Sequence, residues 1–309
     1  MDCKPAGTSH PSTTEERGRP RIAVFAYSEV GYACLEELLD AGANVVCVFT
    51  HEDAGDEAIW FRSVERLAVS RGIPVRVEPK IDAASAAFLE KLGVEIVFSF
   101  YYRAVIPRKV LEIPRLGAYN MHGALLPQYR GRACVNWALI NGETRTGVTL
   151  HEMTAEVDKG DIVDQESTPI HPHDTAYSVF VRIADLSRVV LARNLRSIEA
   201  GTARREKQDE SRATTFGRRT PADGEIDWNK SAPEIYNLIR ALTHPFPGAF
   251  THIDDRKAYI WRASVTAEPG QHSPGEIVSR HPLVIAARGG LLTVHSYQME
   301  GEPEVSYCA

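Results

Sequence analysis

The sequence predicts an α/β protein in which a Rossmann-like, doubly wound and mostly parallel sheet is followed by a smaller β-barrel domain of the OB-like type. Three observations in the 309 residues predict this fold class. Short apolar runs alternate with amphipathic stretches, a polar and basic segment then interrupts the alternation, and strand-like segments follow at a spacing of about 8 to 12 residues. We therefore expect a disordered tail at residues 1–19, a first domain at 20–204, a linker at 205–220 and a second domain at 221–309.

The first domain opens with a strand–helix–strand pattern. Residues 21–27 form a short apolar run typical of a buried parallel strand, residues 31–42 carry apolar side chains on one helical face, and residues 44–50 form a second strand. The same alternation continues to residue 200, which indicates a parallel sheet with helices on both faces. The further elements that we expect are a helix at 59–71, a strand at 74–77, a helix at 83–92, strands at 94–100, 146–153 and 161–170, and a long amphipathic helix at 175–200.

The second domain has the pattern of a small, mostly β unit. A single helix is expected at residues 232–242, shortly after the linker. It is followed by short strand-like segments separated by turn residues, namely AFTHID, KAYIWRASV, GEIVSR, LVIAAR and LLTVHSY. This arrangement favours a small β-barrel, either closed or open.

Composition limits the partners of the protein. The formal net charge of −6 gives no positive field that would attract tRNA or DNA, so we expect no nucleic-acid partner. Five cysteines without paired or metal-type spacing favour a reducing, cytoplasmic location and no metal site. No apolar stretch reaches the roughly 18 residues of a membrane helix. We expect a cytoplasmic protein that acts on small molecules away from membranes, and the choice between a monomer and a homo-oligomer stays open.

The chemistry is expected to centre on three polar residues. Asn120 and His122 lie two positions apart near the end of a strand-like segment, so their side chains share one face at its carboxyl end, where open α/β sheets bind ligands. Gly123 is expected to let the chain turn sharply there, and Asp158 lies in a tight Asp-Lys-Gly-Asp turn. An amide donor, a group that titrates near pH 7 and a carboxylate suit acyl transfer, in which the amide stabilises an oxyanion and the imidazole exchanges the proton.

Each of these residues also has a structural interpretation. A single histidine on a strand is more often hydrogen-bonded within the fold than catalytic, and Asn and Asp are common turn residues. The histidine-containing stretches at 51–53 and 171–174 lack the spacing of metal ligands, and we interpret them as solvated loops. The spacing alone therefore leaves both interpretations of the site open.

The segment NMHGALLP at residues 120–127, with the downstream Asp-Lys-Gly, resembles the active-site signature of 10-formyltetrahydrofolate-dependent formyltransferases. The likeness extends from residue 21 to residue 297 and includes FSFYYR, RGRACVNW, FGRRTP and PFPGAF. Within that family the sequence is most similar to the formyltransferase domains of bifunctional polymyxin-resistance proteins, which formylate UDP-4-amino-4-deoxy-L-arabinose. The resemblance implies the formyltransferase fold, a nucleotide-linked amino sugar as acceptor, 10-formyltetrahydrofolate as co-substrate and no metal.

The resemblance also implies roles for individual residues. Asn120 would stabilise the transition state, His122 would act as the acid/base, and Asp158 would raise the pKa of the histidine. The folate would be bound mainly through backbone groups, because alanine and valine side chains offer a pterin no polar contacts. The residues expected to surround it are Ala104, Val105, Ile106, Arg132, Thr154, Ala155, Glu156, Val157 and Asp158.

Two positions depart from the family pattern near this site. Ala124 stands where the family usually has Ser, and Cys134 stands where it has Pro. Neither change removes a catalytic group. The loss of a proline frees the loop, however, and would alter which acceptor sugar fits.

Two other functions are alternatives. The first is methionyl-tRNA formyltransferase, but residues 221–309 contain seven Lys and Arg against eleven Asp and Glu, a formal charge of −4 that opposes the binding of tRNA phosphates. The second is a non-catalytic module that binds folate or a sugar nucleotide. The presence of Asn120, His122 and Asp158 together argues against such a module, because a binding protein does not need all three.

Overall fold

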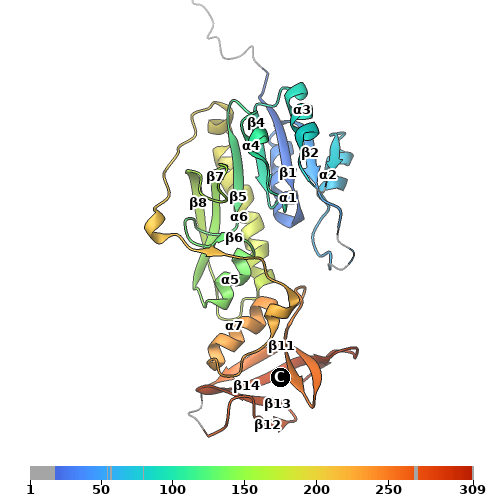
Figure 1. Ribbon diagram of the computed structural model, residues 1–309, viewed down its shortest axis with the longest axis vertical. Coiled ribbons are helices and arrows are strands. Elements are labelled where there is room, and N and C mark those ends of the chain that lie inside the picture. Colours follow the sequence, from blue (N-terminus) through green and yellow to red (C-terminus); the bar gives the residue numbers. More distant parts are fainter. Residues whose placement is uncertain (1–17, 54, 56–57, 79, 268–270, 308–309) are drawn as a thin grey trace, which may run out of the picture.

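The computed structural model describes residues 18–307, except residues 54, 56–57, 79 and 268–270. Figure 1 shows the larger N-terminal domain at the top and the smaller C-terminal domain below it, with α7 (Ala232–Leu242) between them. Residues 1–17, which make up most of the predicted tail, lie outside the described residues.

Within the described residues, seven strands form one sheet in the N-terminal domain, in the order β3-β2-β1-β4-β5-β7-β8. The first five strands in this order are parallel, β7 is antiparallel to β5, and β8 is antiparallel to β7. After β1 the chain adds β2 and β3 on one side, and after β4 it adds β5 on the other side. The order of the strands therefore reverses between β1 and β4, and the carboxyl ends of strands at such a reversal are a common ligand-binding position. The strands are β1 (Arg21–Ala26), β2 (Asn44–Thr50), β3 (Val75–Val77), β4 (Ile96–Phe100), β5 (Ala118–His122), β7 (Arg145–Glu152) and β8 (Ile162–Pro169).

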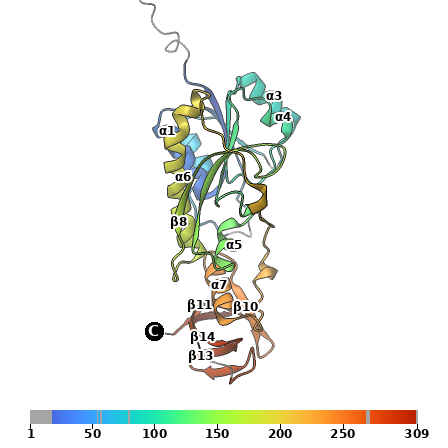
Figure 2. The ribbon, with the colours of Figure 1, turned by 90° about the vertical axis from the view of Figure 1, so that its left-hand side faces the viewer.

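Helices cover both faces of this sheet, and Figure 2 shows α1 and α6 on one side and α3 and α4 on the other. The helices α1, α2, α5 and α6 share one apolar core with the sheet, whereas α3 and α4 share another on the opposite face. In the part of the chain that the structure describes, no helix is both long enough and apolar enough to cross a membrane. The helices are α1 (Ser28–Asp40), α2 (Val64–Ser70), α3 (Ala83–Leu92), α4 (Arg108–Leu111), α5 (Cys134–Ile140) and α6 (Ala176–Glu199), with short 3₁₀ turns at η1 (Glu210–Arg212) and η2 (Pro221–Gly224).

The predicted fold class is confirmed, and several element boundaries follow from local sequence signals. The helix expected at 83–92 is α3, which begins where the Asp82 carboxylate caps the first turn and ends where Gly93 adopts a left-handed conformation. The helix expected at 59–71 is shorter, because the Ser63 side chain caps it and α2 begins only after that residue. The sequence does not predict α4 and α5, since four and seven residues are too few to show a helical apolar pattern.

The C-terminal domain is an antiparallel half-barrel, which confirms the small open barrel expected from the sequence. Within the described residues its strands pair in the order β10-β11-β14-β13-β12, and β15 adds to β14. The helix α7 packs on this sheet through Ile235 and Ile239, which share an apolar core with Ile260 and Leu292. The strands are β10 (Ala249–Ile253), β11 (Arg256–Thr266), β12 (Ile277–Arg280), β13 (Leu283–Ala287), β14 (Gly290–Met299) and β15 (Val305–Ser306).

Hydrogen bonds dock α7 on the N-terminal domain. Arg240 of α7 is buried, and its Nη1 donates to the backbone oxygens of His171 and Asp174, each at 3.1 Å. From the other side, Asn136 of α5 donates to the backbone oxygen of Ala241 at 2.8 Å. These bonds fix the half-barrel against α5 and the loop that precedes α6.

The segment predicted as a linker, residues 205–220, is packed against the N-terminal domain. Near its start Glu206 exchanges two backbone hydrogen bonds with Ile162 at the beginning of β8. Further along, β9 (Thr215–Phe216) pairs in parallel with β6 (Arg130–Gly131), in the loop beyond β5. Figure 1 shows the segment running down beside β8 and then crossing toward α7. The polar composition of residues 205–220 predicts that the segment is exposed, but it does not predict these backbone hydrogen bonds to the N-terminal domain.

Arg19, the last residue of the predicted tail, is bound to the N-terminal domain. Its guanidinium lies 2.9 Å from Glu199 Oε1 and also donates to the backbone oxygen of Ala41, and the Glu199 side chain is only 8% exposed. We expect removal of residues 1–17 to leave the melting temperature unchanged, because a polar segment has little apolar area to bury. Arg19→Ala should cost about 1 kcal/mol and lower the melting temperature by roughly 2 to 4 °C in thermal unfolding.

Arg204→Ala is the matched control for this substitution. Its guanidinium lies 2.6 Å from Glu206, but both side chains are well exposed, and such pairs contribute little to stability. The control should therefore unfold like the unchanged protein. Equal melting temperatures for Arg19→Ala and the unchanged protein would contradict the docking of Arg19.

Candidate active site

The predicted catalytic residues lie where β5 and β7 pair. Asn120 and His122 lie on β5, directly opposite His151 and Thr149 of β7. Residues that face each other in a ladder project to the same side of the sheet, so these four polar side chains form one group. Between them on β5, Met121 projects to the opposite side and enters the apolar core.

His122 is buried, and its two ring nitrogens face different partners. Nε2 lies 2.8 Å from the backbone oxygen of Tyr129, which can only accept a hydrogen bond, so Nε2 carries a proton. Nδ1 lies 3.6 Å from Asp158 Oδ2, an ion-pair distance that is longer than a hydrogen bond. Burial by itself would lower the pKa of His122, but the Cys134 sulfur, the Asp158 carboxylate and the hydrogen bonds of the ring raise that pKa to about 10. The Asp158 carboxylate beside Nδ1 therefore favours the protonated form of the ring.

Asp158 lies between two imidazole rings. Its Oδ2 accepts the backbone N–H of Gly131 at 2.8 Å, and its Oδ1 lies 3.6 Å from His151 Nε2. Burial alone would raise the pKa of this carboxyl, but the charge of His122 and the Gly131 N–H hold it well below its usual range. Its backbone φ of +56° lies in the left-handed region, which is uncommon for residues other than glycine but is tolerated better by aspartate than by most.

The chain reaches Asp158 by folding back over the sheet. β7 ends beside the start of β5, where the backbone N–H of Met153 donates to the oxygen of Ala118 at 2.8 Å. Residues 154–157 must then return along the polar face of β5, because Asp158 contacts Gly131, which follows the other end of that strand. The loop after β7 therefore carries the carboxylate back to the histidine.

His151 orients the amide of Asn120. Its Nδ1 donates to the backbone oxygen of Glu152 at 2.7 Å, which leaves Nε2 as an acceptor. Asn120 Nδ2 lies 3.2 Å from that Nε2 and donates one of its two N–H groups to it. No described residue accepts the second N–H, which is thus left for a ligand. His151 is not among the residues predicted from the sequence, although its alternation with Thr149 on an expected strand is a signal for it.

The loop after β5 requires glycine for a reason other than the expected one. Gly123 does not adopt the left-handed backbone of a sharp glycine turn. A β-carbon at this position would overlap the hydroxyl group of Tyr101, so a larger residue would have to displace that side chain. Tyr101 itself has a φ of +57° and packs edge-on against Phe180, with 5.4 Å between ring centres.

The two positions that depart from the family pattern are both buried. The backbone oxygen of Ala124 accepts the Thr149 hydroxyl at 2.6 Å, so this part of the loop is held without a side-chain hydroxyl of its own. Cys134 places its sulfur 3.4 Å from His122 Nε2. The cysteine therefore changes the surroundings of the imidazole directly, in addition to any effect on the loop.

The residues expected to surround the folate belong to loops around the three predicted catalytic residues. They are Ala104, Val105 and Ile106 after β4, Arg132 after β6, and Thr154, Ala155, Glu156 and Val157 before Asp158. Arg132 ties its loop to the one after β4, because its Nη2 donates to the backbone oxygen of Arg103 at 2.9 Å. Val105 and Val157 are 71% and 61% exposed, whereas Ile106 is buried in the core and offers only its backbone. Two exposed valines fit a partly apolar ring system.

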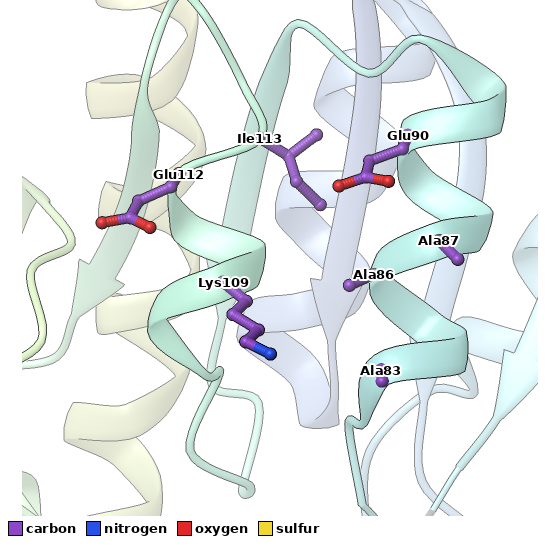
Figure 3. Close-up of a pocket in the computed structure, with 7 residues that line it drawn as sticks. All are labelled: Ala83, Ala86, Ala87, Glu90, Lys109, Glu112 and Ile113. Carbon is purple, nitrogen blue, oxygen red and sulfur yellow. The ribbon is translucent and has the colours of Figure 1, made fainter.

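The surface hollow between α3 and α4 is separate from this site. Figure 3 shows it between the alanines of α3 and the segment that carries Lys109 and Ile113, and none of the predicted site residues lines it. A smaller hollow, at the carboxyl ends of β1 and β2, includes His51. His51 is half-buried rather than solvated, since its ring stacks on Tyr102 at 4.0 Å and its Nε2 accepts the backbone N–H of Arg103 at 3.0 Å.

Comparisons with known proteins match both domains. A sequence profile of the family described as Formyl transferase matches residues 20–195, and one described as Formyl transferase, C-terminal domain, matches residues 218–307. The N-formyltransferase from Helicobacter canadensis, solved with folinic acid and dTDP-3-aminofucose, has a TM-score of 0.72 at 22% identity, over 91% of this chain and 99% of that chain. WlaRD, a sugar 3N-formyl transferase solved with dTDP and 5-N-formyl-THF, has a TM-score of 0.70 at 20% identity, over 93% and 100%. HypX from Aquifex aeolicus, solved with tetrahydrofolic acid, has a TM-score of 0.62 at 18% identity, over 94% and 46%.

We expect Asp158→Asn to lower the pKa of His122, because the substitution removes the negative charge beside Nδ1. In the unchanged protein the ring should keep its proton through neutral pH and lose it only near pH 10. Since this pKa is raised above the ordinary 6.5, protonation of His122 stabilises the fold fully below pH 6.5, and the contribution is lost as the pH rises toward 10. NMR titration of the ring protons measures the shift.

Asp161→Asn is the matched control, because it removes the same charge from the same loop. Asp161 faces Lys207 at 3.9 Å. It makes no described contact with His122, so the control should leave the titration of that ring unchanged. If both variants titrate like the unchanged protein, Asp158 is not the cause of the raised pKa.

Proposed function

The chain belongs to the formyl transferase family, and from this premise we propose that it moves the formyl group of 10-formyltetrahydrofolate to the primary amine of a nucleotide-linked amino sugar. One arrangement carries the proposal. Asn120 has an amide N–H with no acceptor among the described residues, and beside it lies the buried imidazole of His122, whose protonated form is favoured by Asp158. Such a set can stabilise negative charge and move a proton within one small volume.

These groups match the charges that develop in formyl transfer to an amine. When bound, 10-formyltetrahydrofolate supplies a formyl carbon open to attack. The second N–H of Asn120 would donate to the formyl oxygen as negative charge grows on it. His122 would give its proton to the nitrogen that leaves the formyl carbon and regain one from the attacking amine. Asp158 would stabilise the charged ring and keep its orientation.

Three exposed side chains support folate as the formyl donor. Val105 and Val157 would contact the apolar face of a flat ring from the two loops. Arg132 is anchored to the oxygen of Arg103 through one nitrogen, and its other N–H groups suit a carboxylate or a carbonyl of the donor. The folate compounds present in the solved structures from Helicobacter canadensis and Aquifex aeolicus support the same assignment.

Charge and likeness support an amino sugar rather than tRNA as the acceptor. The formal charge of −4 on residues 221–309 opposes the binding of tRNA phosphates. Two of the solved relatives contain dTDP-3-aminofucose or dTDP. The sequence likeness favours UDP-4-amino-4-deoxy-L-arabinose, or a closely similar 4-amino sugar, within this class.

A screen of acceptors tests the proposal. Purified protein would be incubated with 10-formyltetrahydrofolate and a panel of UDP-linked and dTDP-linked amino sugars, with charged initiator tRNA as a separate arm, and products read by mass spectrometry. We expect a formylated sugar nucleotide, with UDP-4-amino-4-deoxy-L-arabinose among the best acceptors. Formylation of the tRNA alone would overturn the choice of acceptor, and binding without turnover in every arm would indicate a binding module.

Substitution of the two polar residues on β5 tests the mechanism. His122→Ala should lower turnover by at least about 100-fold, and Asn120→Ala by roughly 100- to 1000-fold. Folate binding, measured by calorimetry, should persist in both because the folate contacts lie on other loops. His295→Ala is the control, since that partly buried histidine bonds to Ser264 in the C-terminal domain, away from the candidate site. Wild-type turnover in folded His122→Ala would falsify the proton-transfer role.

A further inference from the structure

We propose that Gln208 is a positioning residue for the active site, although it lies in the segment between the two domains. Its amide is bonded on both sides. Nε2 donates to the backbone oxygens of Asp158 and Gly160, both at 2.8 Å, and Oε1 accepts from Arg130 Nη2 at 2.7 Å and Nε at 3.1 Å. One side chain thus links the inter-domain segment, the Asp158 turn and the loop after β5.

The Asp158 turn needs a hold from outside. A left-handed backbone is uncommon even for aspartate, which tolerates it better than most residues, so contacts from the surroundings help to keep the turn in this form. Gly160 is confined as well, because a β-carbon there would lie 1.8 Å from the backbone oxygen of Glu152. The two bonds from Gln208 hold the turn at both of these residues. They therefore oppose the rotation that would carry the Asp158 carboxylate away from His122.

Arg130 fixes the orientation of the Gln208 amide, because it donates two hydrogen bonds to the amide oxygen. Its side chain is 4% exposed, and it pairs with both carboxylate oxygens of Glu210, at 2.6 and 2.9 Å. Loss of these acceptors would leave the buried guanidinium charge without a compensating partner, which is strongly destabilising. The next residue, Gly131, donates its N–H to the Asp158 carboxylate. Residue 130 therefore holds the turn through Gln208, and residue 131 holds the carboxylate directly.

The inter-domain segment does not depend on Gln208 for its own place. Glu206 is bonded to Ile162 on one side of it, and β9 is paired with β6 on the other. Loss of the Gln208 amide should therefore loosen the Asp158 turn while the segment stays attached. This inference rests on the proposed role of Asp158, so its test includes a measurement of His122 that does not require turnover.

The test compares Gln208→Leu and Gln208→Glu with the unchanged protein and with Asp158→Asn. Both Gln208 variants lose the amide N–H groups that donate to the Asp158 turn. Gln208→Glu keeps an acceptor for Arg130, so this variant tests the inference if Gln208→Leu does not fold. We expect kcat to fall roughly tenfold or more with little change in the KM for folate. The alkaline limb of kcat/KM and the NMR pKa of His122 should both move to lower pH. In an Asp158→Asn background, Gln208→Leu should add almost no further loss, because both changes act through the same ring.

Gln298→Leu in the C-terminal domain is the matched control. Gln298 also bridges two groups, since it donates to the oxygen of Glu302 at 2.8 Å and accepts from Trp261 at 3.3 Å. Its loss should affect stability but leave the titration of His122 unchanged. Folded Gln208 variants with an unchanged His122 titration, or losses that multiply in the double variant, overturn the inference. If Asp158→Asn itself leaves turnover intact, the proposed function fails, and the NMR titration alone then decides the role of Gln208.

Discussion

A buried negative charge between two imidazole rings organises the candidate active site. The Asp158 carboxylate is almost completely removed from water, and an isolated charge in that position would be strongly unfavourable. It pairs with His122 on β5 and accepts the backbone N–H of Gly131 in β6, and the ring of His151 on β7 lies beside it. The same charge favours the protonated form of His122. Stability of the buried carboxylate and the chemistry of the histidine therefore depend on one interaction.

The direction of β7 makes this interaction available. A parallel strand beside β5 would send its following loop outward from the carboxyl end of the sheet. Because β7 is antiparallel, it ends beside the start of β5, and the loop that follows returns across the polar face of that strand. The antiparallel register also sets His151 opposite Asn120. The antiparallel direction of β7 therefore helps to build the candidate active site.

The segment between the domains contributes to the same site. A polar segment can be a solvated linker, in which water pairs with its polar groups, or it can be packed against a domain and form hydrogen bonds with it. Polar composition alone does not distinguish these two cases. Here Gln208 and Glu210 supply the acceptors of buried Arg130, and Gln208 also binds the Asp158 turn. A free linker would leave Arg130 without those acceptors. The segment that connects the two domains therefore also supports the Asp158 turn.

The sequence by itself determined the fold class, the small β-rich C-terminal domain and the common face of Asn120 and His122, because alternation along a strand is a local property. Only the tertiary structure decided what surrounds these residues. The register of β5 with β7 brings His151 to Asn120, and the Tyr101 side chain after β4 occupies the space where a β-carbon of residue 123 would lie. The left-handed turn at Asp158 accepts hydrogen bonds from Gln208, in a segment whose composition indicates only exposure. Each of these contacts joins residues that are distant along the chain, and no local periodicity encodes such a pairing.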